Sequence, residues 1–429
     1  MQRAYDDISW SGFPVAPAGS QSSRSLRGRS ALVLGDHRQA LAIARSLHRA
    51  GYRVIAGRHG GRTLLERSRC VTEVWEHPSV GDRVAWTEAL EAFCAARRDL
   101  GAVFPVGVEE IERLSPLAAR LPVLVVAAGA SALAVCRSKR ALLVLADRLR
   151  VPTERWAVVG DRDALLPALE RVGLPAVVKP DRHGEGHGFK AAILERRADA
   201  MRLADRIPFP ACGLVLQRLA PGARHNVYFL ARKGALLGLA QVRILRTDRP
   251  DGTGLAVEGV SVGPDPALVE STTALVRALD YTGAGCAQYM VDAATTTTSF
   301  LEINARLGAN CAAACACGLD LPRLFIDALL GTAAPQKPAR VGRRYAWLEG
   351  DLHGLVSCLV SGRIGWGAAS AWLLRAILAQ LRARDHIVFS WRDPLPALAT
   401  PGLWIQAALR RASGAHRHAR PALPTGGTS

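Results

Sequence analysis

Lysine is scarce in this chain, although the chain as a whole is basic. Only five of its 55 basic residues are lysines, and the formal net charge is +18 over 429 residues. Lysine carries a compact ammonium on a flexible stem, whereas arginine carries a planar fork, so the two bind phosphate groups differently. Each lysine is therefore informative, because the composition otherwise favours arginine.

Several signals of location and nucleic-acid binding are also missing. No apolar run approaches the roughly 20 residues that span a bilayer, and the acidic Asp6 and Asp7 without an apolar stretch are unlike a signal peptide. The nine cysteines have no paired spacing, which is typical of reduced thiols. No zinc-finger or helix-turn-helix spacing is found. We therefore expect a cytoplasmic protein that does not bind nucleic acid.

Composition divides the chain into several units. With 49% hydrophobic residues it is long enough for two or three packed parts. Residues 1–28, rich in Ser, Gly, Pro and Arg, are expected to be a disordered leader. Three units are predicted over 29–130, 131–210 and 211–335. A basic extension follows over 336–429, with 13 Lys or Arg against four Asp or Glu.

The first unit begins with the alternation typical of a parallel α/β sheet. Residues 31–35 and 52–57 are apolar runs, and residues 39–50 between them have helical spacing. Gly35 is the only glycine in the first turn, so the GxGxxG pattern of dinucleotide-binding folds is absent. We expect a structural α/β domain rather than a nicotinamide site.

Two of the scarce lysines lie where phosphate groups can be bound. Lys139 is near the start of a predicted helix, and Lys179 is near the end of the apolar strand 175–180. A glycine-rich segment follows Lys179, which predicts a loop whose backbone amides approach phosphate oxygens. Its glycines are Gly184, Gly186 and Gly188. The alternative is an ordinary loop after a structural lysine.

Residues 300–310 place three polar side chains at every second position after an apolar run. Alternate positions of an extended segment project from one face, so Glu302, Asn304 and Arg306 are presented together. The polar turn before this segment predicts a hairpin that brings Gln288 beside Glu302. Carboxylate and amide oxygens suit magnesium bound together with phosphates. The alternative is a solvated strand end.

Taken in order, these segments resemble the ATP-grasp superfamily over residues 31 to about 335. The chain looks most similar to predicted carboxylate–amine ligases of the carbamoyl-phosphate-synthase-like group. The resemblance implies an α/β and α+β fold class. A parallel pre-ATP-grasp α/β domain over 29–130 would be followed by two α+β subdomains that grip ATP, 131–210 as the lid and 211–335 as the metal and phosphate site. A helical basic extension would complete the chain.

The resemblance also implies roles for single residues. Lys139 and Lys179 match lysines that contact ATP phosphates, and the glycine loop would cover them. Three positions match the adenine hinge: Gln217, Arg218 and Leu219. Three positions match the ligands of Mg²⁺ or Mn²⁺: Gln288, Glu302 and Asn304. Many relatives have an acid where this chain has Gln288, which leaves Glu302 as the main anionic ligand.

Two arginines complete the site that the resemblance implies. Arg306 would lie near the transferred phosphate or the substrate, and Arg243 resembles the arginine that holds an acyl phosphate or a substrate carboxylate. Specificity is expected around residues 104–110 and in a loop over 243–258.

The resulting hypothesis is an ATP- and magnesium-dependent ligase. It would activate a small-molecule carboxylate as an acyl phosphate and join it to an amine through a carbon–nitrogen bond. One alternative is a carboxylase that activates bicarbonate, although no biotin-carrier motif accompanies the chain. A second alternative is a catalytically weak ATP-binding scaffold, which the glutamine at 288 favours.

The extension contains one strongly amphipathic segment. Residues 369–384 have helical spacing of apolar and basic positions, with Trp372, Leu373, Ile377 and Leu381 among the apolar ones. The first interpretation is a helix packed on the body with a solvated basic face. The alternative is a surface over 364–412 that contacts anionic lipid or a protein partner. A homodimer is also open.

Overall fold

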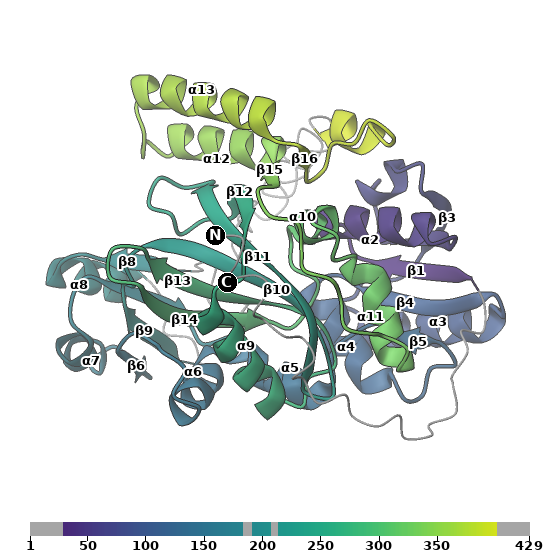
Figure 1. The fold of residues 1–429 in the computed structure, drawn as a ribbon, viewed down its shortest axis with the longest axis horizontal. Coiled ribbons are helices and arrows are strands. Elements are labelled where there is room, and N and C mark those ends of the chain that lie inside the picture. Colours follow the sequence, from purple (N-terminus) through teal and green to yellow (C-terminus); the bar gives the residue numbers. More distant parts are fainter. Residues whose placement is uncertain (1–28, 183–190, 207–212, 401–429) are drawn as a thin grey trace, which may run out of the picture.

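The computed structural model describes residues 29–182, 191–206 and 213–400, which form three β-sheets with flanking helices (Figure 1). The leader 1–28 lies outside the described residues, as do Gly184, Gly186, Gly188 and residues 401–412 of the proposed contact surface. Among the described residues, none of the helices has the length and apolar character needed to cross a membrane.

The first sheet is the parallel α/β domain that the sequence predicts. Its five strands have the order β3-β2-β1-β4-β5 and all pair in parallel. They are β1 (Ser30–Leu34), β2 (Arg53–Arg58), β3 (Val71–Glu76), β4 (Leu100–Pro105) and β5 (Leu124–Val125). Every residue of β1 and β4 is buried, as expected of central parallel strands covered on both faces.

Helices on both sides explain this burial. They are α2 (Arg38–Arg49), α3 (Arg83–Ala96) and α4 (Val108–Leu117). The apolar face of α2 packs on one side of the sheet, and Trp86 and Leu90 of α3 pack on the other. α3 begins after Asp82, whose carboxylate accepts a hydrogen bond from the amide of Ala85 at 3.2 Å. The sheet is therefore a two-sided core.

The second sheet is small and antiparallel. Its order is β6-β9-β7-β8, and two helices cover it. The elements are β6 (Trp156–Val159), α7 (Leu165–Val172), β7 (Ala176–Pro180), β8 (Ala192–Leu194), α8 (Arg197–Arg206) and β9 (Leu214–Arg218). It has a hydrophobic core of its own between the strands and these helices. Lys179 and Gln217 lie on its adjacent strands β7 and β9.

The third sheet is the largest, with the order β14-β13-β10-β11-β12-β15-β16. Its strands are β10 (Ala223–Arg232), β11 (Ala235–Thr247), β12 (Ala256–Val262), β13 (Gly283–Asp292), β14 (Thr297–Asn304), β15 (Arg344–Ala346) and β16 (Asp385–His386). The last two come from the basic extension, which the sequence analysis expected to be helical. Strands β11 and β12 also show that the predicted loop 243–258 was wrong, because only residues 248–255 connect them.

Alternate residues of β10 face two different cores. Val227 and Phe229 pack toward α5 (Ala130–Arg137), α6 (Lys139–Arg148) and α9 (Pro266–Ala278). Tyr228 and Leu230 pack toward α10 (Cys311–Ala316) and α11 (Leu321–Leu330), in a core that also contains α2. The large sheet and the parallel domain thus share one hydrophobic core. The domain boundaries predicted from composition stay a prediction.

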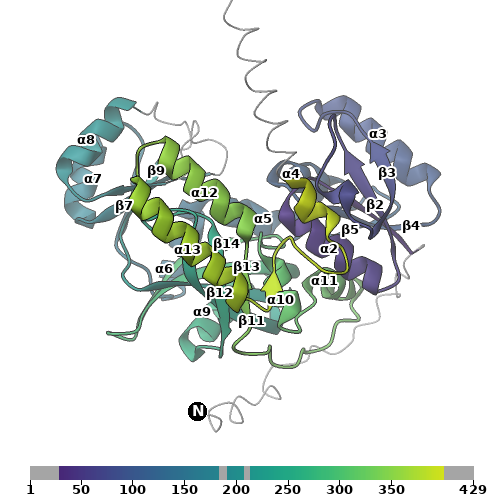
Figure 2. The same cartoon turned by 90° about the horizontal axis from the view of Figure 1, so that it is seen from above.

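The extension adds a helical hairpin above the large sheet (Figures 1 and 2). It consists of α12 (Leu348–Val360) and α13 (Trp366–Arg382). The interpretation that the apolar side of α13 packs on the body was wrong, because Leu373, Ile377 and Leu381 are exposed. Alanines form the buried side instead, and their small side chains let α13 lie close to its neighbours. They are Ala369, Ala376 and Ala379.

A buried aspartate ties the end of the described chain to the parallel domain. The Asp393 carboxylate accepts hydrogen bonds from Arg45 Nε at 2.8 Å, Ser68 Oγ at 2.7 Å and the Arg69 amide at 2.9 Å. The side chain of Asp393 is 4% exposed and that of Arg45 is 13% exposed. Removing one partner of such a pair leaves the other charge buried without compensation.

We expect Asp393→Ala to lower the free energy of unfolding by about 3 kcal/mol, measured by urea denaturation followed by circular dichroism. Asp205→Ala is the matched control, because Asp205 pairs with Arg162 at a site where both side chains are more than half exposed. It should cost no more than about 1 kcal/mol. Equal losses in the two variants would contradict the expectation.

Candidate active site

The start of α6 is held by a carboxylate at the end of β7. Ser138 caps the helix by accepting a hydrogen bond from the Ala141 amide at 3.0 Å. The Asp181 carboxylate accepts from Ser138 Oγ at 3.0 Å and from the Arg140 amide at 2.8 Å. Lys139 Nζ donates to the carbonyl oxygen of Asp181 at 3.4 Å. These contacts fix the buried Lys139 beside the strand that carries Lys179.

Lys179 lies where the small sheet meets the large one. Its Nζ donates to Oε1 of Gln217 at 3.5 Å. Burial lowers the pKa of Lys179, the nearby Glu302 carboxylate counteracts this effect, and Lys139 adds to the lowering. Glu302 belongs to β14 and Lys139 to α6, so three separate elements bring their charges together at this point.

The predicted hairpin is present, and it pairs the predicted residues. β13 and β14 are antiparallel, with Gln288 opposite Glu302 and Cys286 opposite Asn304. Nδ2 of Asn304 donates to Oε1 of Glu302 at 2.9 Å. On the other side, Gln288 is opposite Asn226 of β10. Asn226, Gln288 and Glu302 therefore form one polar row on one face of the sheet.

Three buried polar atoms around this row have no hydrogen-bond partner among the described residues. They are Nε2 of Gln217, Nε of Arg224 and Oδ1 of Asn226. Buried polar groups are normally satisfied, because leaving them unpaired costs free energy. The two unpaired donors and the two ammonium groups fit an anionic ligand such as a nucleotide, and the acceptor Oδ1 of Asn226 fits a cation or a donor group of the ligand.

The donor set for a metal ion contains one acid. Among the described residues, no group of three or more His, Cys, Asp or Glu side chains could hold a metal. Glu302, Asn304 and Gln288 supply oxygen atoms only, which is the chemistry that Mg²⁺ prefers. They fit an ion that takes its remaining ligands from nucleotide phosphates and water. Their role as metal ligands stays a prediction.

The predicted adenine hinge lies at the end of β9. The amide of Arg218 donates to the Arg155 carbonyl at 2.8 Å, and the amide of Leu219 donates to the Pro175 carbonyl at 2.9 Å. Both backbone donors are thus used within the protein. Nε2 of Gln217 is a buried donor at this position that has no partner among the described residues.

The structure does not bring Arg243 together with these residues. Arg243 is exposed on β11 and lies opposite His225 of β10, whereas Asn226 lies opposite Val242. Successive side chains of a strand point to opposite faces, so Arg243 projects away from the polar row. Arg224, on the same face as Asn226, donates through Nη1 to the Gly254 carbonyl at 3.1 Å. The sequence analysis missed this arginine.

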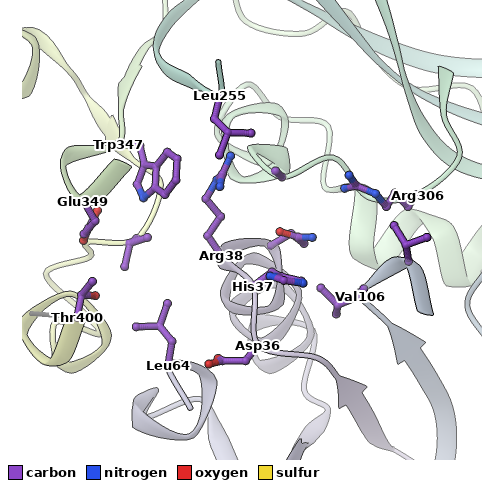
Figure 3. Close-up of a pocket in the computed structure, with 15 residues that line it drawn as sticks. Asp36, His37, Arg38, Leu64, Val106, Leu255, Arg306, Trp347, Glu349 and Thr400 are labelled. Carbon is purple, nitrogen blue, oxygen red and sulfur yellow. The ribbon is translucent and has the colours of Figure 1, made fainter. Parts of the chain in front are cut away.

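A pocket of about 370 Å³ opens beside Arg306, at the carboxyl ends of β1 and β4 (Figure 3). The strand order reverses between these two strands, and such switch points are where open α/β sheets bind ligands. Asp36 and His37 follow β1 in the lining, and Val106 and Gly107 follow β4. Specificity was expected around 104–110, which includes the last two.

The pocket holds charges of both signs. The Arg38 guanidinium lies 3.7 Å from the centre of the Trp347 ring, and Arg38 Nε donates to Oδ1 of Asn310 at 2.8 Å. Burial lowers the pKa of Arg38 to about 10. Burial raises the pKa of the Asp36 carboxyl and of the Glu349 carboxyl. The pocket therefore presents cationic and acidic groups to one ligand.

Different signals would have been needed to find these residues from sequence. Asp36 and His37 directly follow an apolar strand, so the switch-point rule could have pointed to them. Trp347 and Glu349 reach the pocket from the extension, and they follow Asp36 and His37 by more than 300 residues along the chain. No local pattern predicts that contact.

The thiols near the site are buried packing residues. Cys286 of β13 and Cys311 of α10 are both buried, and burial raises the pKa of each thiol to about 12. A thiol with such a pKa is a poor nucleophile at neutral pH. No covalent intermediate on cysteine is needed here.

The arrangement of sheets and site defines the class of protein. A parallel α/β domain is followed by two antiparallel sheets that meet at Lys179 and Glu302, and this is the ATP-grasp fold. Residues 265–333, which include β13 and β14, match the family described as carbamoyl-phosphate synthase L chain, ATP binding domain. No curated protein sequence matches the chain.

Solved structures support the same fold. One similar structure is the biotin carboxylase domain dimer of 2-oxoglutarate carboxylase from Hydrogenobacter thermophilus, in complex with MgADP, ADP and bicarbonate. Its sequence is 15% identical and the TM-score is 0.58, and the match covers 74% of this chain and 73% of that one. An N5-carboxyaminoimidazole ribonucleotide synthetase with ADP is 12% identical with a TM-score of 0.60, over 76% and 82%. L-amino acid ligase from Bacillus licheniformis is 15% identical with a TM-score of 0.56, over 71% and 75%. At these identities the likeness is one of fold.

We expect Asp181→Ala to loosen the start of α6, because it removes the acceptor that holds Ser138 and the Arg140 amide. The free energy of unfolding should fall by about 1 kcal/mol, and hydrogen exchange of amides 140–142 should accelerate. Asp161→Ala, which removes the acceptor of the Ala164 amide in a remote loop, is the control. Unchanged exchange at 140–142 in Asp181→Ala would show that Asp181 does not hold this helix start.

Proposed function

We propose that the protein is an ATP- and magnesium-dependent ligase that activates a carboxylate as an acyl phosphate and joins it to an amine. The observation that carries the proposal is the meeting of Lys139, Lys179 and Glu302. Arg306 follows Asn304 of β14 by two residues and lines the pocket, so it connects the oxygen donors to the pocket. Related folds include both carboxylases and amine ligases.

The first step needs compensation of negative charge. A carboxylate oxygen of the substrate attacks the γ-phosphorus of ATP, the bond to the bridging β,γ-oxygen breaks, and ADP leaves. The attack brings anions together, and the ammonium groups of Lys139 and Lys179 stabilise the transferring phosphoryl group. Arg306, at the edge of the pocket, is placed to orient the carboxylate.

Magnesium fits the oxygen donors of Glu302, Asn304 and Gln288. When bound there, the ion neutralises phosphate charge during transfer. The hydrogen bond from Asn304 to Glu302 holds the carboxylate in place on the strand. The unpaired Nε2 of Gln217, whose Oε1 accepts from Lys179, is a further donor for the nucleotide.

The second step joins the amine. An ammonium bound by Asp36 and Glu349 first gives one proton to one of these carboxylates. The neutral nitrogen then attacks the acyl carbon, the bond from this carbon to the phosphate oxygen breaks, inorganic phosphate leaves, and the nitrogen loses its second proton. Arg38 and Arg306 attract a carboxylate. A zwitterionic substrate, such as an amino acid, matches both signs.

The charges of the pocket favour the amine ligase over the bicarbonate-activating carboxylase. Asp36 and Glu349 suit an amine, and Arg38 and Arg306 suit a carboxylate.

The test is phosphate release from ATP with magnesium, screened against pooled amino acids and small carboxylates. We expect stimulation by an acid together with an amine, and a loss of about 100-fold or more in Lys179→Ala and Glu302→Gln. Lys337→Ala, an exposed lysine of the extension, is the matched control and should retain activity.

Two results would overturn the assignment. Stimulation by bicarbonate alone would identify the carboxylase reaction. Tight ATP binding in a direct titration without turnover in any pool, and without recovery in Gln288→Glu, would identify a scaffold that binds ATP.

A pH profile of ATP binding tests separately whether Lys179 binds a phosphate group of ATP. Burial lowers the pKa of this lysine, so its ammonium is lost at a lower pH than that of a free lysine. We expect the Kd for ATP in the wild type to start rising at a lower pH than the value of about 10.4 at which an ordinary lysine titrates. Lys179→Arg stays charged there and should give a flatter profile. Parallel profiles in the two proteins would exclude Lys179 as a phosphate ligand.

A further inference from the structure

One helix of the extension has an apolar face that nothing in the described chain covers. The outer face of α13 consists of five residues: Trp366, Leu373, Leu374, Ile377 and Leu381. Trp366 is 79% exposed, Leu374 58% and Leu381 77%. At 100° per residue, these positions fall within about 100° of one side of the helix. A contiguous apolar face of this kind marks a contact surface.

The outer face of α13 cannot turn inward, because the other side of the helix already packs against the rest of the protein. Ala369, Ala376 and Ala379 are buried against the hairpin and the sheet. Trp372 Nε1 donates to the Asp351 carboxylate of α12 at 2.5 Å, and Asp351 forms a buried ion pair with Arg246 of β11. Figure 1 shows α13 at the outer edge of the molecule, next to α12.

The charge around the outer face has one sign. Residues 352–384 contain no Asp or Glu, and their four charged residues are Arg363, Arg375, Arg382 and Arg384. On the helical projection, Arg375 and Arg382 border the outer face next to Leu378, and both are exposed. Arginine stems can lie along an apolar layer while their guanidinium groups reach its polar boundary.

We propose that the outer face of α13 docks on the surface of an anionic lipid bilayer. Leucine, isoleucine and tryptophan side chains would enter the boundary between headgroups and acyl chains, and the flanking arginines would bind anionic headgroups. Tryptophan favours this boundary, and Trp366 begins the helix. The helix lies parallel to the membrane and does not cross it.

A second copy of the chain fits this surface less well. In a symmetric dimer the same face meets itself, so arginines would face arginines. The acid-free segment offers them no carboxylate partner, and like charges across an interface oppose association. An anionic bilayer supplies the missing opposite charge.

The experiment is flotation of the full chain with lipid vesicles. Binding is expected to phosphatidylcholine vesicles that contain phosphatidylglycerol, to be much weaker with phosphatidylcholine alone, and to fall as salt is raised. The variant Leu374→Ser/Ile377→Ser/Leu381→Ser should lose binding. The variant Arg375→Gln/Arg382→Gln should bind about 25-fold more weakly, at about fivefold for each arginine.

A control substitutes one exposed arginine and one exposed aliphatic residue on α3, far from the hairpin. Arg83 and Val84 are both exposed, and Arg83→Gln/Val84→Ser should bind like the wild type. Because all these positions are exposed, circular dichroism and thermal unfolding should be unchanged in every variant. Equal binding by all variants would overturn the proposal.

Sedimentation velocity tests whether a second copy of the chain, instead of a membrane, covers the outer face of α13. A wild-type dimer that becomes monomeric in the Leu374→Ser/Ile377→Ser/Leu381→Ser variant, together with no vesicle binding, would assign the face to self-association and overturn the lipid assignment. A monomer that floats with anionic vesicles supports it.

Discussion

The register of β10 against β13 is the constraint on which the core and the candidate site both depend. Tyr228 and Leu230 of β10 enter the core shared with the parallel domain, while Asn226, on the same face, lies opposite Gln288 in the polar row. A shift of one residue would move every side chain of the strand to the other face. Apolar packing at one end of β10 therefore positions polar atoms at the other end.

Sequence reasoning succeeded where a signal was local. The pairing of Gln288 with Glu302 followed from a polar turn and strand alternation, and the structure has the same pairing. Sequence reasoning failed where the position of a side chain depended on packing between segments far apart along the chain. Arg243 could not be assigned to a face without its partner strand, and Glu349 joins the pocket from the extension. Likewise, residues 369–384 were correctly predicted to be helical, but small alanines rather than leucines face inward.

The site combines groups from all three sheets, and each sheet contributes a different kind of chemistry. The small sheet supplies the ammonium of Lys179, the large sheet supplies oxygen donors, and the parallel domain supplies the pocket through Asp36 and His37. Burial shifts their pKa values in the direction that disfavours charge, lowering that of Lys179 and raising that of Asp36. A bound ligand of complementary charge offsets that cost.

The ion pair between Arg246 and Asp351 has a consequence for communication within the molecule. Arg246 lies near the end of β11, just before the connection 248–255 whose Leu255 lines the pocket, and Asp351 holds α13 through Trp372. A displacement of the hairpin must either break this buried pair or carry β11 with it. Coupling of this kind is reciprocal in free energy: whatever restrains the hairpin restrains the pocket edge, and an occupied pocket restrains the hairpin to the same extent.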